Sequence, residues 1–232
     1  MTSATERADE YWAAVFDVEV GELRRPGLHT TLVDEPNSGI YVLSIGEAVH
    51  IRAPMRLRDA VEAVASTPSP LDTMRPETWR RIAGSGNEVL GPASHFLGSD
   101  DVRSMHPEAE PSLAELQQLS AGIAADELDE SGVLEPGVRR FGLWRDGRLL
   151  AVSALSTWIG APTDVGLLVS PRSRGHGVGR EVAAIALSAA IRGSGIARWR
   201  CREDNAASMA LARGFGLQPY ARNLGIRLSG AS

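Results

Sequence analysis

The spacing of apolar residues in the first half of the chain changes from a helical period to short runs typical of strands. Trp12, Phe16 and Val20 recur at the spacing of one helix face, a period that predicts an amphipathic helix. Along this half, the pattern predicts helices over 1–25, 56–66 and 76–84, and strands over 29–34, 39–46, 47–54 and 87–98. We therefore expect a small α+β unit here.

The second half has a different order of elements, and no repeat of fixed period links the two halves. Ser112 and Glu115 form a capping-box pattern that opens a predicted helix over 111–128. The pattern then predicts a hairpin over 138–158, strands over 164–170, 196–202 and 222–229, and helices over 180–193 and 205–216. The strand over 164–170 has almost no polar residues, which predicts burial on both of its faces.

A polar segment separates the two halves. Residues 99–111 are acidic and contain two prolines, a composition typical of a connecting loop. We therefore expect an N-terminal domain over 1–105 and a second domain over 106–232. Strands and helices together in the second domain predict an α/β (α+β) fold, in which helices flank a mixed β-sheet.

Composition limits the class of protein. No apolar run reaches the length that a membrane span needs, and the polar start MTSATERADE lacks the features of a secretory signal. Cys201 is the single cysteine, so no internal disulfide forms. These features favour a cytoplasmic protein with no membrane partner. All 24 basic residues are arginine, which excludes a catalytic lysine.

Charge is unevenly distributed along the chain. The net charge is −5, yet residues 170–232 carry ten arginines against three acidic residues. A basic segment attracts phosphorylated ligands, although a solvated basic surface shows the same excess. The five histidines have no metal-ligand spacing, and no interleaving of basic with aromatic residues points to nucleic acid. We expect neither a metal nor a nucleic-acid partner.

The stretch VSPRSRGHGVGREVAA, residues 169–184, carries the most specific signal. Gly175, Gly177 and Gly179 stand between a predicted strand and a predicted helix. Glycines let backbone N–H groups turn toward a common point, and the helix N-terminus adds unpaired N–H groups and the positive end of its dipole. This arrangement predicts an anion site that suits a phosphate or a pyrophosphate.

Two common phosphate-binding loops fit this stretch poorly. A Walker loop ends in Gly-Lys-[Ser/Thr], and the chain has no lysine. A dinucleotide loop reads G-x-G-x-x-G early in the chain, with an acid about 20 residues further on. Here the spacing is G-x-G-x-G late in the chain, and Arg198, Trp199 and Arg200 stand where the acid is expected. A nucleotide-binding α/β domain is therefore kept only as an alternative.

The loop resembles the acetyl-CoA loop of the GNAT superfamily of N-acetyltransferases. In that family a strand ends in Val, Pro follows, and then comes [Arg/Gln]-x-x-Gly-x-[Gly/Ala], which residues 174–179 (RGHGVG) fit at every specified position. The segment DNAASMALARGFGL, residues 204–217, is similar to the family's Asn-initiated helix, with Phe215 between two glycines as a departure. The element order over 111–229 also fits, whereas residues 1–105 resemble no family.

The resemblance implies where acetyl-CoA binds. Residues 167–169 occupy the position of the strand whose backbone pairs with the pantetheine arm. The backbone over 175–180 is implied to hold the pyrophosphate, and Asn205 to hydrogen-bond the pantetheine. The implied cofactor-binding residues are Leu167, Leu168, Val169, Arg174, Gly175, His176, Gly177, Val178, Gly179, Arg180 and Asn205.

The resemblance also implies that a primary amine attacks the thioester directly, with a backbone N–H near Val169 stabilising the oxyanion. An ammonium must first lose a proton. The candidate bases are Asp164, Glu203 and Asp204, and deprotonation through water needs none of them. Many members carry a Tyr seven residues after the Asn, where it protonates the thiolate, but this chain has Ala212 there.

We therefore expect an acetyl-CoA-dependent N-acetyltransferase whose second partner is an amine-bearing acceptor. Residues 1–105 are expected to complete the acceptor pocket, and their acidic character favours a cationic acceptor. The alternative is a non-catalytic acyl-CoA-binding sensor or interaction module, which the missing tyrosine favours. The sequence leaves the acceptor and the oligomeric state open.

Overall fold

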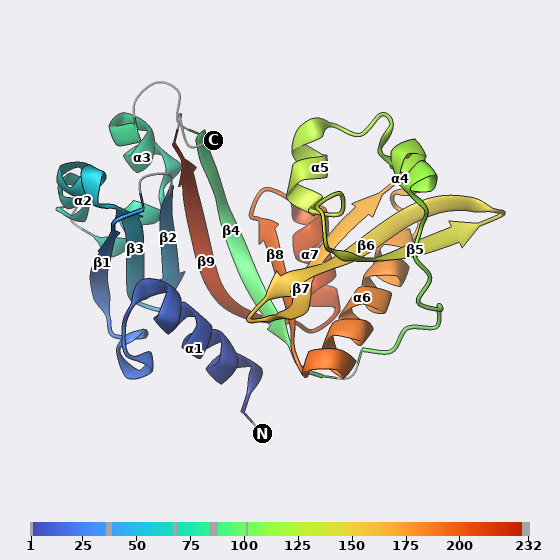
Figure 1. Cartoon of the computed structure of the whole chain (residues 1–232), viewed down its shortest axis with the longest axis horizontal. Helices are drawn as coiled ribbons and strands as arrows, with labels where there is room; N and C mark the ends of the chain where they lie inside the picture. The colour runs from blue at the N-terminus through green and yellow to red at the C-terminus, as the bar shows by residue number, and fades with distance from the viewer. Residues whose placement is uncertain (1, 36–38, 67–68, 84–87, 101, 229–232) are drawn as a thin grey trace.

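The computed structural model describes residues 2–35, 39–66, 69–83, 88–100 and 102–228. Within these residues, the strands form one nine-stranded mixed sheet in the order β1-β3-β2-β9-β4-β8-β7-β6-β5 (Figure 1). The strands are β1 (Gly27–Val33), β2 (Ile40–Ile45), β3 (Ala48–Pro54), β4 (Glu88–Gly98), β5 (Arg139–Arg145), β6 (Arg148–Trp158), β7 (Ala161–Val169), β8 (Ala197–Arg202) and β9 (Gln218–Arg227).

Helices cover both faces of the sheet. They are α1 (Ala4–Phe16), α2 (Arg58–Ala65), α3 (Pro76–Ala83), α4 (Leu113–Ser120), α5 (Ala125–Ser131), α6 (Val178–Ser194) and α7 (Ala206–Gly214), with short 3-10 segments η1 (Val20–Glu22), η2 (Met55–Leu57), η3 (Pro70–Met74) and η4 (Pro171–Ser173). Neighbouring residues on a strand point to opposite faces. On β4, Phe96 packs with α6 and α7, and Leu97 packs with α1. On β6, Ala151 packs with α6 and Val152 packs with α4 and α5.

The predicted element types are confirmed at most positions, with boundaries that differ by a few residues. Residues 87 and 229, at the ends of two predicted strands, lie outside the described residues. The capping box at the start of α4 is confirmed, because Ser112 Oγ accepts a hydrogen bond from Glu115 N and the Glu115 side chain accepts one from Ser112 N. In the N-terminal helix, α1 ends at Phe16, well before the predicted end at residue 25.

The continuous helix predicted over 111–128 is wrong. The segment forms two helices, α4 and α5, separated by a turn in which Ile123 N donates to Ser120 O. Gly122 lies in this turn, and glycine costs a helix interior about 1 kcal/mol relative to alanine. The break brings the second helix, α5, against β7.

Strand β4 joins the two parts of the chain. It comes from the first half of the sequence, but it lies between β8 and β9 and pairs antiparallel with both. In Figure 1 this green strand separates the orange β8 from the red β9. The sheet therefore runs without interruption through residues before and after the predicted boundary, while the division into domains 1–105 and 106–232 stays a prediction.

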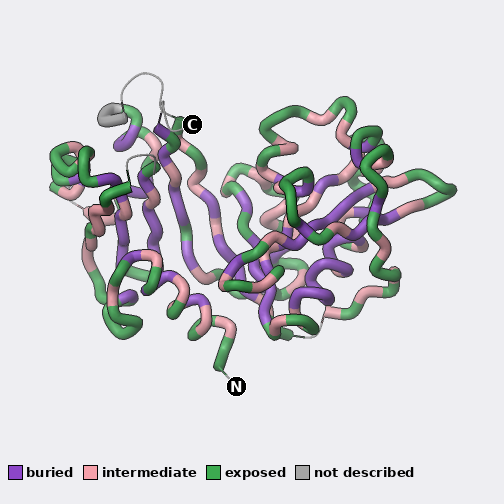
Figure 2. The backbone as a smooth tube through the Cα atoms, in the orientation of Figure 1, coloured by how far each residue is buried: buried purple, intermediate pink, exposed green. Residues whose placement is uncertain are grey.

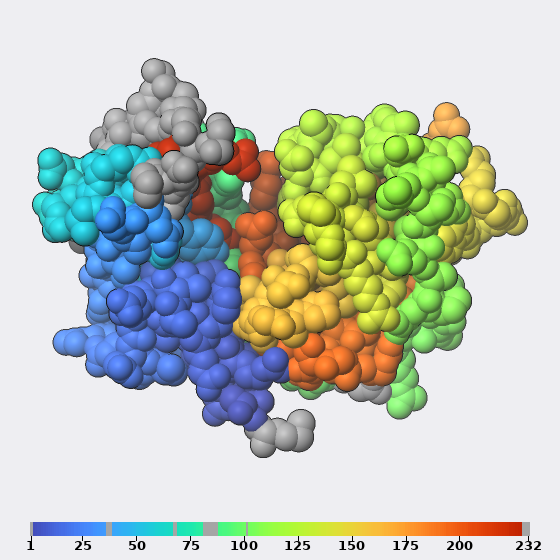
Figure 3. All heavy atoms as spheres, in the orientation of Figure 1, coloured from blue at the N-terminus to red at the C-terminus, as the bar shows by residue number. Residues whose placement is uncertain are grey.

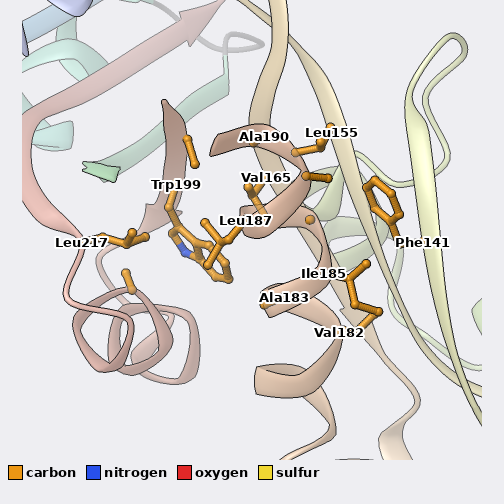
Figure 4. Close-up of a cluster of buried hydrophobic side chains, with 14 of the residues drawn as sticks. Phe141, Leu155, Val165, Val182, Ala183, Ile185, Leu187, Ala190, Trp199 and Leu217 are labelled. Carbon is orange, nitrogen blue, oxygen red and sulfur yellow. The ribbon is translucent and has the colours of Figure 1, made fainter. Parts of the chain in front are cut away.

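The largest apolar cluster lies between α6 and the strands β5 to β8. Trp199 of β8 points toward Leu187 of α6, and Phe141 of β5 lies at the other end of the cluster (Figure 4). Figure 2 shows the same distribution, with buried residues concentrated in the central strands and along α6. Burial of each such large side chain stabilises the fold by about 1.5–3 kcal/mol, which fixes β7 and β8 against a common helix.

Candidate functional site

Strands β7 and β8 run parallel but pair only over two positions. The paired residues are Asp164 with Arg198, and Val165 with Trp199. Beyond these positions, residues 166–169 of β7 do not pair with residues 200–202 of β8, because the two strands diverge. Backbone N–H and C=O groups at such an opening require other hydrogen-bond partners. The opening therefore offers a strand edge to a ligand.

A cavity of about 750 Å³ occupies this opening. This is within the usual size range of small-molecule sites. It is lined by parts of β7, the glycine loop, β8, α7 and α5: Asp126, Glu127, Glu130, Ser131, Val165, Gly166, Leu167, Val169, Arg174, Gly175, Gly177, Gly179, Arg180, Trp199, Arg200, Arg202, Asp204, Asn205, Ala207, Ser208, Ala210 and Leu211. Sequence segments more than 70 residues apart thus meet around one space.

Most of the residues implied by the resemblance line this cavity. These are Leu167, Val169, Arg174, Gly175, Gly177, Gly179, Arg180 and Asn205, together with the candidate base Asp204. The side chains of Leu168 and Val178 are instead buried in apolar clusters. The implied role of these two residues concerns their backbone, and it stays a prediction, as does the cofactor role of the whole set.

The prediction that the strand over 164–170 is buried on both faces is wrong for its second half. Leu168 is buried under α4 and α5, whereas Leu167 and Val169 are only partly buried. The cause is the divergence of β8, which leaves this part of β7 beside the cavity. The apolar residues of this part of β7 therefore form a strand edge that borders the cavity.

The glycine loop turns its backbone toward the cavity. Gly175 and Gly177 have φ angles of +78° and +79°, a left-handed conformation that side chains with a Cβ disfavour. Gly177 is also the N-cap of α6, and its carbonyl accepts from Arg180 N and Glu181 N. The first N–H groups of α6 lack partners within the helix. This geometry fits the predicted anion site.

Protein groups already hold Arg174 and Arg180, the two arginines of the loop that line the cavity. Arg174 forms an ion pair with Glu127 of α5 at 2.5 Å and donates to the carbonyl of Val169. Arg180 donates to the carbonyl of Gly214 at 3.0 Å and stacks over the ring of Phe215. Among the described residues, the exposed His176 has one hydrogen-bond partner, the carbonyl of Arg174, which it reaches through Nδ1. Backbone groups, rather than these side chains, are therefore the free donors of the loop.

Asn205 connects two sides of the cavity. Its Oδ1 accepts from Ser208 N at 3.0 Å and so caps α7, while its Nδ2 donates to Glu130 of α5 at 3.4 Å. Glu130 also accepts from the backbone N–H of Arg202. Ser208 Oγ accepts from the indole of Trp199 at 3.0 Å. Asn205 thus fixes the start of α7, and its amide lies at the cavity wall.

Ion pairs engage all three candidate bases. Asp164 lies 3.4 Å from Arg198. Glu203 forms two bonds to Arg222, at 2.5 and 2.8 Å, and this arginine holds the pKa of Glu203 below its usual value. Arg202 lowers the pKa of the exposed Asp204 in the same way. A lowered pKa makes a carboxylate a weaker base. Their catalytic roles stay predictions, and these contacts favour deprotonation through water.

Two other residues, Ala212 and Cys201, are buried in positions that disfavour a catalytic role. Ala212, at the position where the resemblance puts a tyrosine, is a residue of α7 and is fully buried in the core. No side-chain acid can act from it. Cys201 is buried, and that burial raises the pKa of its thiol, which disfavours the nucleophilic thiolate.

Sequence reasoning missed the contribution of α5. A Cβ at Gly166 of β7 would overlap the carbonyl oxygen of Ser131, the last residue of α5. The helix end therefore packs directly on the strand backbone and brings Glu127 and Glu130 to the cavity. The only sequence signal was Gly122 inside the predicted helix, which marks the break that makes α5 a separate element. Arg200, Trp199 and Ser208 also line the cavity without having been assigned to it.

Among the described residues, no group of three or more His, Cys, Asp or Glu side chains has an arrangement that could hold a metal ion. No helix in this described part of the chain has both the length and the apolar character needed to cross a bilayer.

Comparisons with known proteins identify a family for the segment that contains the cavity. The model of the acetyltransferase (GNAT) family matches residues 102–217, a span that contains β5 to β8, the glycine loop and α7. An acetyltransferase from the GNAT family of Colwellia psychrerythraea is 14% identical, with a TM-score of 0.49, over 79% of this chain and 77% of that chain. A GCN5-related N-acetyltransferase from Kribbella flavida is 19% identical, with a TM-score of 0.44, over 62% and 61%.

The comparison with curated proteins found no significant match. The structural likenesses are too distant to add an argument about activity, so the assignment depends on the family model, which spans half of the sequence. The chain belongs to the acetyltransferase (GNAT) family.

Proposed function

We propose that the protein is an acetyl-CoA-dependent N-acetyltransferase that moves an acetyl group to a primary amine. The observation that carries this proposal is the position of the glycine loop at the mouth of the cavity between β7 and β8, inside the segment that the family model matches. The loop suits a pyrophosphate, and the diverging strands leave an edge for an amide-containing arm. Acetyl-CoA has both groups.

The residues present fit this co-substrate. The backbone of residues 166–169 has no strand opposite it on the cavity side, which supports pairing with the amides of the pantetheine. Leu167, Val169 and Leu211 give the same wall an apolar surface. The positive φ angles of Gly175 and Gly177 let the loop approach a pyrophosphate closely. The acyl end then lies toward the point where β7 and β8 meet, near Val165 and Trp199.

In the proposed reaction a neutral amine attacks the carbonyl carbon of the thioester. The C–N bond forms, and a backbone N–H of β7 near the strand junction stabilises the negative charge that develops on the oxygen. The C–S bond then breaks, the nitrogen loses its second proton, and the thiolate of CoA takes up a proton. Asp164 is the candidate base nearest to the strand junction, although Arg198 holds it.

The second candidate function is a non-catalytic acyl-CoA-binding sensor or interaction module. The burial of Ala212 and the ion pairs of the three candidate bases favour it, because Ala212 supplies no proton donor and each of these three bases already has a cationic partner. Both functions predict the same binding site for acetyl-CoA, so turnover must separate them.

The test is release of free CoA from acetyl-CoA in the presence of a panel of amines, which includes amino acids, their amides, aliphatic diamines and peptides. Thiol detection suits this assay because Cys201, the single cysteine, is buried. Acceptor-dependent release that Gly177→Glu abolishes supports the enzyme. Binding of acetyl-CoA without release for any amine would contradict the catalytic proposal and favour the sensor.

A further inference from the structure

The face of the sheet opposite α6 and α7 contains a hollow. Figure 3 shows it between the N-terminal part of the chain, coloured blue and cyan, and α5 in yellow-green, with strands of the sheet at its floor. Trp199 and Cys201 of β8 are buried against α6 and α7. Because side chains alternate along a strand, Arg198, Arg200 and Arg202 point to the face with the hollow.

Arg200 differs from the other arginines that line the cavity. Glu127 pairs with Arg174, Asp204 pairs with Arg202, and the Gly214 carbonyl holds Arg180. The exposed guanidinium of Arg200 forms no hydrogen bond or ion pair within the described residues. It is therefore a cation in the cavity wall whose donors are free for a ligand.

The position of Arg200 separates it from the pyrophosphate end of the site. It follows Trp199, the last β8 residue that pairs with β7, so it stands where the two strands begin to diverge. On its other side it pairs in register with His95 of β4, and its charge lowers the pKa of that buried ring, after the larger effects of burial and Arg198. The glycine loop lies at the other end of the diverging strands.

The cavity wall also offers negative charge. Glu130 accepts two hydrogen bonds, from the backbone N–H of Arg202 and from Asn205 Nδ2, but no cation pairs with it within the described residues. Asp126 lines the same wall. A guanidinium without a partner and carboxylates outside any ion pair thus line one cavity, and this combination matches a ligand that carries both an amine and an anionic group. Guanidinium groups bind carboxylates through two parallel hydrogen bonds.

We propose that Arg200 binds a carboxylate of the acceptor, so that the acceptor is an amine that also carries a carboxylate, as a free amino acid does. This inference rests on the proposed acetyl transfer and adds the substrate class to it. The free base form of the amine attacks as described above, while the carboxylate bound at Arg200 orients it toward the thioester.

The test measures acetylation of amino acids and of their amides by the wild type, Arg200→Gln and Arg200→Lys. The amides keep the amine of the amino acids but lack the carboxylate. Hydrogen bonds to charged groups contribute about 1.5–3 kcal/mol, so we expect Arg200→Gln to lower kcat/KM for amino acids about 10- to 100-fold, mainly through KM. Activity with the amides should change little, and Arg200→Lys should restore part of the preference. Arg213→Gln, an exposed arginine of α7 outside the cavity wall, is the matched control.

Two results would overturn the proposal. One is an equal loss of activity with amino acids and amides in Arg200→Gln. The other is a weaker Kd for acetyl-CoA in that variant with an unchanged preference between the two acceptor types, which would assign Arg200 to the co-substrate.

A readout without turnover separates this proposal from the proposed function. The thermal shift of the CoA-bound protein is measured with the amino acids and with their amides. If no amine is acetylated, the catalytic proposal fails, but a shift that needs the carboxylate and disappears in Arg200→Gln still supports the binding role of Arg200. The same shift with both acceptor types would contradict that role.

Discussion

Asp164 of β7 and Arg198 of β8 are register partners, one position before the last pair of the two strands, and their side chains form an ion pair with 3.4 Å between Asp164 Oδ1 and Arg198 Nε. Arg198 is buried and also stacks over the ring of Trp158. The Asp164 side chain is 23% exposed. This pair therefore holds the closed end of the opening that contains the cavity.

Asp164→Asn should destabilise the fold. The substitution leaves the buried guanidinium of Arg198 without its counter-charge, and removing one partner of such a pair is costly. Because Asp164 is partly exposed, we expect a loss of about 1–3 kcal/mol in the free energy of unfolding, measured with urea. Adding Arg198→Met in the double variant should recover part of this loss. A single variant as stable as the wild type would contradict the structural role of the pair.

Gly166→Ala should disturb the cavity through α5. The added Cβ would overlap the carbonyl oxygen of Ser131, so the end of α5 must move away from β7. Overpacking of this kind costs about 1–3 kcal/mol, and we expect weaker acetyl-CoA binding as well. Gly193→Ala is the matched control, since a Cβ there meets nothing within 4 Å. It should be neutral or slightly stabilising. Equal behaviour of the two variants would show that α5 does not shape the site.

Stability should fall as the pH drops below about 6.5. Burial keeps the pKa of His95 well below its usual value, and the pKa of His50 is lowered for the same main reason. In the unfolded chain both rings take up a proton near pH 6.5. The unfolded state therefore binds more protons below this pH, which lowers the free energy of unfolding by up to about 1.4 kcal/mol per pH unit for each ring.

The variant His95→Gln tests this origin. It keeps an N–H donor for Asn223 Oδ1, the present partner of His95 Nε2 at 2.7 Å, but it does not titrate. Urea unfolding between pH 7 and pH 5 should give a shallower slope for this variant than for the wild type, with the remaining slope carried in part by His50. Identical slopes would show that His95 is not the source.

The C-terminal segment should depend on β4 for its fold. Without residues 1–105, β8 and β9 lose the strand that pairs with both of them, and their backbone groups have no partner. We expect the fragment 106–232 to lack a cooperative thermal transition by circular dichroism, whereas 88–232, which keeps β4, should regain part of the native signal. A cooperative transition in the shorter fragment would support an independent second domain.

Local sequence pattern predicted most elements because it depends on contacts within each element. The glycines, the capping box and the alternation along β8 are signals of this kind. The insertion of β4 between β8 and β9 joins residues 99 or more positions apart, and no local pattern reveals it. No local pattern reveals the contact of Ser131 with Gly166 either, nor the ion pairs of Asp164 and Glu203. The sequence could therefore indicate the glycine loop and the acidic residues that are candidate bases. It could not indicate which charged side chains lack an ion-pair partner in the folded chain.

The most direct test is calorimetric titration of the wild type, Gly177→Glu and Gly177→Ala with acetyl-CoA. Both variants carry the strain of a side chain at φ +79°, and only Gly177→Glu adds a negative charge to the loop. We predict micromolar binding by the wild type, weaker binding by Gly177→Ala and none by a folded Gly177→Glu. No binding by the folded wild type, or equal binding by all three, would contradict the claim that the glycine loop holds acetyl-CoA.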